Sequence, residues 1–67
     1  MSNNIKYIKE IYVDDYNTFS QVILIDYKVN NITNGLHAKL LRSSVNPNLH
    51  LSKTIYIRDE EEEKINE

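Results

Sequence analysis

Residues Phe19 to Val29 read Phe-Ser-Gln-Val-Ile-Leu-Ile-Asp-Tyr-Lys-Val and form the densest apolar run in the chain. Alternate residues divide into two faces, and the middle of the run, Val22 to Ile25, is apolar on both of them. A strand with two apolar faces is typical of a position that is covered from both sides. We therefore predict a strand over 19–29 at the centre of a small sheet.

The cover for the second face of this strand has to come from elsewhere. The segments on either side in the sequence each offer one apolar face, which is interrupted by Lys9 in one case and by Lys53 in the other. Three sources could supply the missing cover: a curled sheet, a helix formed by residues 36–41, or a second subunit. The sequence leaves these three open.

Two other segments show the alternation of a half-buried strand. Ile5 to Val13 also fits helical spacing, but its β-branched and aromatic residues favour a strand. Leu49 to Arg58 has the clearest alternation in the chain. Residues 14–18, Asp-Asp-Tyr-Asn-Thr, predict a turn, and residues 43–48, which contain the single proline, predict a loop.

The segment that follows Asn34-Gly35 is ambiguous. Asn-Gly is a strong signal for a two-residue hairpin, because both residues tolerate positive φ, and it would place Val29 opposite Leu40. Residues 36–41 are also good helix-forming material, and Asn34 could cap such a helix. We favour the strand, because the turn signal and the short length outweigh the helix propensity.

Together these segments predict an all-β domain over residues 1–58, a small antiparallel four-stranded meander that forms a curled sheet or a partly open barrel. The alternative is an α+β fold of order β-β-α-β with a short helix near residues 35–43. Residues 59–67 carry a net charge of −5, whereas the preceding body carries +3. They predict a disordered acidic tail.

The residue content argues against catalysis and against a metal or cofactor site. The chain has no cysteine, no glycine-rich phosphate loop, and only two histidines, His37 and His50, without a ligand-spacing motif. No apolar run reaches the roughly 20 residues of a membrane span. We therefore expect no enzyme activity, no cofactor and no membrane partner, and we expect a soluble cytoplasmic protein.

Binding is the remaining class of function. Exposed tyrosines are favoured at interfaces. The candidate partner-binding residues are Tyr12, His50, Tyr56, Arg58, Asp59, Glu60, Glu61, Glu62 and Glu63. We predict a small protein-binding regulator or inhibitor of the kind that phages and mobile elements encode. It would block a partner, such as a nucleic-acid enzyme, sterically or electrostatically.

Two further expectations concern partners. The small size favours a homodimer, because pairing adds buried area and covers sheet edges. The alternative function is a β module that binds single-stranded nucleic acid, with tyrosines for base stacking and cations for phosphates. In that alternative the acidic tail would be autoinhibitory.

Overall fold

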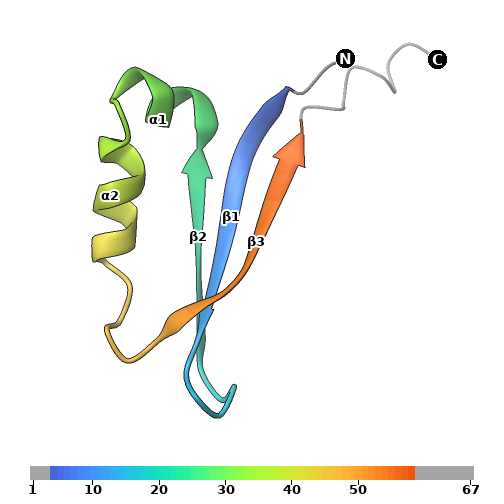
Figure 1. The fold of residues 1–67 in the computed structure, drawn as a ribbon, viewed down its shortest axis with the longest axis vertical. Helices are drawn as coiled ribbons and strands as arrows, with labels where there is room; N and C mark the ends of the chain where they lie inside the picture. Colours follow the sequence, from blue (N-terminus) through green and yellow to red (C-terminus); the bar gives the residue numbers. More distant parts are fainter. Residues whose placement is uncertain (1–3, 59–67) are drawn as a thin grey trace, which may run out of the picture.

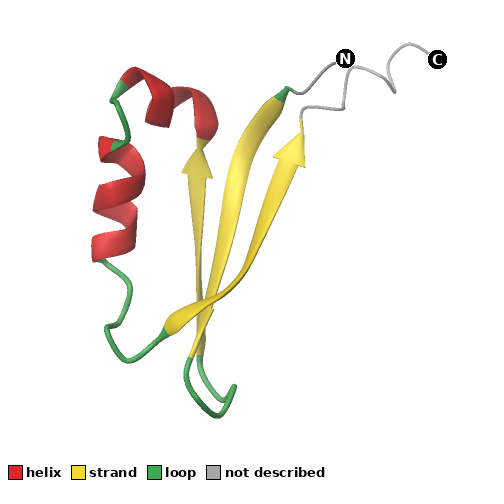
Figure 2. Ribbon diagram, viewed as in Figure 1, coloured by secondary structure: helices red, strands yellow, loops and turns green. Residues whose placement is uncertain are grey.

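Three strands and two short helices make up the described part of the chain, residues 4–58 of a computed structural model (Figures 1 and 2). The elements are β1 (Ile5–Val13), β2 (Ser20–Asp26), α1 (Tyr27–Ile32), α2 (Leu36–Ser43) and β3 (His50–Arg58). The strands form one open antiparallel sheet of order β2-β1-β3. Both helices lie in the connection between β2 and β3, so the fold is α+β.

The centre of the sheet is β1 rather than the apolar run at 19–29. On β1, Lys9 lies opposite Leu24 of β2 and opposite Ile55 of β3. The strand that was predicted to be central is therefore an edge strand. The apolar pattern of this strand therefore does not indicate a central position in the sheet. A helix covers one of its two faces, and no described element covers the other.

The predicted strand also ends three residues early, because Asp26 begins a helix. The Asp26 Oδ1 atom accepts a hydrogen bond of 3.0 Å from the backbone N–H of Val29, and this caps the N-terminus of α1. Residues 27–29 thus belong to α1, and the predicted pairing of Val29 with Leu40 is wrong.

Residues 36–41 form a helix, so the predicted strand there is also wrong. Asn34 and Gly35 have the positive φ angles that their sequence suggests, 55° and 87°, but they join two helices and not two strands. Asn30 Oδ1 accepts from the N–H of Ala38 at 3.0 Å, and Thr33 Oγ1 accepts from the N–H of His37 at 3.1 Å. A side chain of α1 and one of the turn after it therefore satisfy two of the free donors at the start of α2.

The all-β four-stranded meander is therefore wrong in both class and strand number. The α+β alternative has the right class and a helix in the right place, but it lacks α1. Two of the predicted strands are confirmed, since β1 spans Ile5–Val13 and β3 begins one residue after Leu49. The turn between β1 and β2 is held by Asp14 Oδ1, which accepts from the N–H groups of Thr18 and Phe19.

The hydrophobic core is small and lies between α2 and one face of the sheet. Ile23 and Ile25 of β2 and Ala38 of α2 are buried, and Ile8, Tyr12, Leu41 and Val45 pack around them. The molecule is accordingly flat, with extents of 44 × 27 × 15 Å. The helices cover one face of the sheet, and nothing within residues 4–58 covers the opposite face.

The positive φ of Gly35 makes a testable prediction about the turn between the helices. We expect Gly35→Ala to lower the free energy of unfolding by about 1 kcal/mol, because a Cβ disfavours this backbone conformation although no atom lies near enough to clash. Urea unfolding monitored by circular dichroism measures the change. The matched control is Asn34→Gly at the neighbouring positive φ, which should not destabilise the protein; equal losses in both variants would contradict the explanation.

Candidate interaction surface

The face of the sheet opposite α2 is apolar and open. Ile23 and Ile25 point into the core beneath α2, so the alternation of a strand turns Val22 and Leu24 to the other face. Their side chains are 50% and 47% exposed, although each lies in the middle of a strand. No described element covers them.

The pairing of the strands extends this surface over all three. Lys9 lies between Leu24 and Ile55, and Ile11 lies between Val22 and Lys53. Because directly opposite residues share a face, the strand register defines one surface. This surface is called the open face below. Its apolar and basic residues are Tyr7, Lys9, Ile11, Val13, Val22, Leu24, Lys53, Ile55 and Ile57, and the register also places Ser20, Asp26 and His50 at its ends.

A lysine stands at the centre of the open face. Lys9 is on the central strand, with the apolar side chains of Leu24 and Ile55 directly beside it. Within residues 4–58, neither Lys9 nor Lys53 forms an ion pair. The surface therefore combines apolar area with two positive charges that are available to a carboxylate on another molecule.

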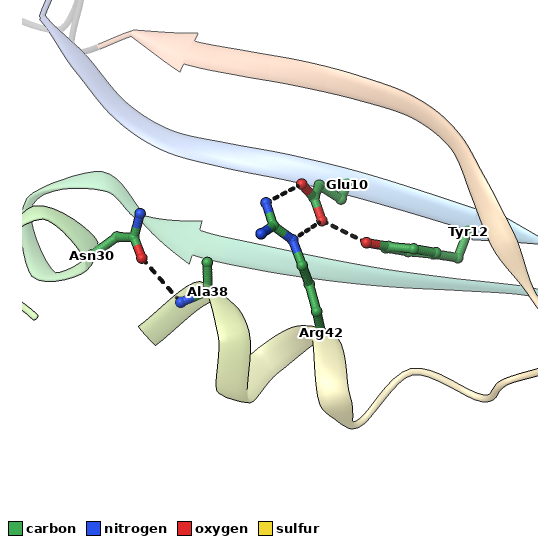
Figure 3. Close-up of polar contacts among 5 residues, drawn as sticks. All are labelled: Glu10, Tyr12, Asn30, Ala38 and Arg42. Carbon is green, nitrogen blue, oxygen red and sulfur yellow. Dashed lines mark hydrogen bonds and ion pairs between the residues drawn. The ribbon is translucent and has the colours of Figure 1, made fainter. Parts of the chain in front are cut away.

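The covered face carries an ion pair between Glu10 of β1 and Arg42 of α2 (Figure 3). Arg42 Nη2 donates to Glu10 Oε2 at 2.7 Å, and Arg42 Nε donates to Oε1 at 3.0 Å. Glu10 is only 4% exposed, whereas the Arg42 side chain remains half exposed. This two-pronged geometry is the strong form of a charged hydrogen bond.

Tyr12 completes this polar cluster. Its hydroxyl donates to Glu10 Oε1 at 2.7 Å, so the carboxylate accepts three hydrogen bonds from side chains. The hydrogen bonds from Arg42 hold the pKa of Glu10 below its usual value, against the opposing effect of burial. Burial and the neighbouring carboxylate raise the pKa of the Tyr12 hydroxyl. The cluster is therefore charged, satisfied and fixed at neutral pH.

The four candidate partner-binding residues that lie within residues 4–58 are not gathered into one site. Tyr12 lies on the covered side of the sheet with its hydroxyl bound to Glu10. His50 and Arg58 stand at opposite ends of β3, and His50 Nδ1 lies 3.7 Å from an oxygen of Asp15. Tyr56 is opposite Ile8 and is more than half exposed. The acidic candidates, Asp59 to Glu63, lie outside the described residues, and the set as a whole remains a prediction.

A second exposed apolar group lies on the helices. Ile32 ends α1, and Leu36 and Leu40 occupy positions one turn apart on α2, so the two leucines share one side of that helix. All three side chains are more than half exposed. This group has fewer residues than the open face and no charge at its centre, so it indicates less about the chemistry of a binding partner.

Other kinds of site find no counterpart in the described chain. Among residues 4–58, no three or more His, Asp or Glu side chains come close enough together to hold a metal ion. His37 and His50 lie on different elements, and His37 Nε2 accepts from the backbone N–H of Asp26. None of the described helices has the length and hydropathy to cross a membrane.

Sequence reasoning missed the open face as a site, although one signal pointed to it. The two apolar faces of residues 22–25 indicated a second cover, and the structure supplies a helix to only one of the faces. Lys9 was read as an interruption of an apolar face, because its central position depends on the strand order. The pairing of Glu10 with Arg42 joins residues 32 positions apart and leaves no local pattern.

The Glu10–Arg42 pair should contribute measurably to stability. We expect Arg42→Ala to lower the free energy of unfolding by about 2 kcal/mol, because Glu10 would remain buried with only Tyr12 as its partner. Urea unfolding at neutral pH measures this loss. Lys39→Ala is the matched control on the exposed side of α2, and its effect should stay within about 0.5 kcal/mol. Equal effects of the two substitutions would contradict the role of the pair.

The same pair predicts how stability depends on pH. Because the pKa of Glu10 is lower in the folded than in the unfolded state, its contribution is present above its usual value of 4.5. That contribution is lost as the pH falls through the lowered folded pKa. The double variant Glu10→Leu/Arg42→Met should lose less stability than the wild type between neutral and acidic pH. Parallel pH profiles of unfolding would contradict the assignment. Asp14, whose pKa is also lowered because it accepts backbone hydrogen bonds, is present in both proteins and so cannot produce a difference between them.

The comparisons with known proteins found no match: no protein-family model matches the chain, and no curated protein or solved structure does.

Proposed function

We propose that the chain is a small non-enzymatic regulator that binds a partner protein through the open face of its sheet. The observation that carries the proposal is the pair of half-exposed side chains, Val22 and Leu24, in the middle of an edge strand. Monomeric proteins rarely expose a contiguous apolar surface of this kind unless it serves an interaction. Occupying the corresponding surface of a partner would block it sterically, as an inhibitor does.

The charges on the open face define the chemistry of that partner. Lys9 and Lys53 are embedded among apolar side chains and have no ion-pair partner within residues 4–58. A bound surface would cover Lys9 and must supply a carboxylate, because an unpaired charge is costly to bury. The partner is therefore a protein with an apolar surface that carries at least one Asp or Glu near its centre. Electrostatic attraction would also speed the encounter.

Binding of single-stranded nucleic acid remains an alternative prediction that no arrangement within residues 4–58 favours. The aromatic residues on which it depends differ in availability. The Tyr12 hydroxyl is committed to Glu10, whereas Tyr56 is exposed on another strand. The basic residues nearest the apolar surface, Lys9 and Lys53, lie on the opposite face from Tyr12.

Capture from a lysate of the native host by four immobilised proteins tests the proposal. The proteins are the wild type, Lys9→Glu, Leu24→Glu and the control Lys39→Glu, whose charge change is the same but lies on α2. We expect at least one protein to be enriched by the wild type and by the control, and lost with both open-face variants. Its affinity should fall with added salt, because the lysines contribute charge pairs.

Two results would overturn this function. One is a set of captured proteins that is the same for all four baits. The other is retention of a nucleic acid, measured by its absorbance after protease treatment, that is unaffected by Lys9→Glu and Leu24→Glu. Circular dichroism of each variant establishes that it is folded, which is expected because both substituted side chains lie on the uncovered face.

A further inference from the structure

The outer edge of β3 has no partner strand in the described chain. β3 pairs with β1 on one side only, and Figure 2 shows no strand beyond it on the other side. An edge of this length presents a row of backbone N–H and C=O groups that can pair with a further strand. The side chains of β3 are also poorly covered, since none of its nine residues is buried. A strand paired along this edge would bond the free backbone groups and cover more of the β3 side chains.

Few features of β3 would prevent such pairing. The pairing of β3 with β1 is irregular at its two ends, between Leu51 and Lys53 and between Ile57 and Arg58. Lys53 is the only charged residue of β3 before Arg58. The stretch Thr54 to Ile57 is regular, free of proline and composed of residues that favour strands. The other edge strand, β2, is less open, because the Gln21 side chain binds the linker after α2 through Ser44 and Asn46.

A second copy of the chain can pair with this edge in an antiparallel register. A register centred on Lys53 would place two lysines directly opposite each other, which is destabilising. A register centred on Ile55 lies between the two irregularities and pairs Ile55 with Ile55 of the second copy. It also places Thr54 opposite Tyr56, a β-branched and aromatic pair of the kind that stabilises sheets. Such a contact is two-fold symmetric and closed, like most dimer interfaces.

We propose that two copies of the protein form a dimer through their β3 edges, antiparallel and centred on Ile55, with a continuous six-stranded sheet of order β2-β1-β3-β3-β1-β2. The competing arrangement is a dimer in which two open faces stack. A two-fold axis near the middle of the face would bring the two Lys9 side chains together, and the repulsion of their charges opposes this arrangement. Edge pairing leaves both open faces free and places them side by side. The dimer does not depend on the proposed function.

The solution mass of three proteins tests the dimer. The wild type should show twice the monomer mass of 7.9 kDa by light scattering over a concentration series. Ile55→Asp should have the mass of the monomer, because two carboxylates would face each other across the two-fold axis of the dimer. Each monomer should remain folded, because Lys9 lies opposite residue 55 in the same copy and offsets the new charge. Val22→Asp is the control on the same face, two strands away from the edge, and should remain a dimer.

Cysteine cross-linking tests the register, because the chain has no cysteine of its own. Ile55→Cys should form a disulfide-linked dimer under mild oxidation, since directly opposite Cβ atoms in antiparallel strands lie close to disulfide distance. Its initial rate should exceed that of Val22→Cys by about tenfold or more, as expected when pairing raises the effective concentration of the thiols. A mixture of Lys53→Cys with Ile57→Cys should cross-link faster than either variant alone, because these two positions are opposite each other in this register.

Three results would overturn the proposal. A monomeric mass for the wild type at its highest soluble concentration excludes the dimer. Loss of the dimer in Val22→Asp together with its retention in Ile55→Asp points to stacked faces. Equal cross-linking rates for Ile55→Cys and Val22→Cys exclude edge pairing at Ile55. Reductant reverses each cross-link and identifies it as a disulfide.

Discussion

The contact between Glu10 and Arg42 determines how the helical layer sits on the sheet. Glu10 is a buried carboxylate on the central strand, and a buried charge is tolerated only where it is paired and hydrogen-bonded. Its partner lies in the last turn of α2, where a cation also interacts favourably with the helix dipole. The contact therefore fixes the end of α2 over the sheet and, with Ala38 against Ile23 and Ile25, selects the face that is covered. The identity of the open face follows from that choice.

The strands were largely predictable, whereas the strand order and the helices were not. Alternation at Ile5–Val13 and at the last strand reports side chains on one half-buried surface, a local property of the sequence. The Asn34-Gly35 pair correctly indicated two positive φ angles, but φ alone does not distinguish a hairpin from a turn between helices. The side chains of Asn30 and Thr33 decide the matter by capping α2, and their contacts become visible only once the turn is formed. Asp26 is a local signal that could have been read as a helix cap, since Asp favours that position.

The candidate surface could be foreseen only as a missing cover. The apolar pattern of residues 22–25 indicates that both faces of the strand are suited to burial, but it does not predict which face a helix covers. That outcome depends on Arg42, far away in the sequence, and on β1 as the strand that joins the other two. With only three apolar side chains buried in the described chain, a large share of the apolar residues remains at the surface. A small domain of this kind gains more from covering its open face and edge than a larger one does, because its own core is limited.

The strand order has a consequence for how the chain folds. The first strand in the sequence is the central one, and its two partners are reached by very different loops: the short turn after Val13 and the long excursion through both helices. The hairpin of β1 and β2 can form from local contacts, whereas β3 must close a large loop before it gains any pairing. β3 also brings few buried side chains to offset that entropy. We therefore expect β3 to pair last during folding and to open first, which would leave a two-stranded sheet with both helices and a free edge on β1 as the first partly unfolded form.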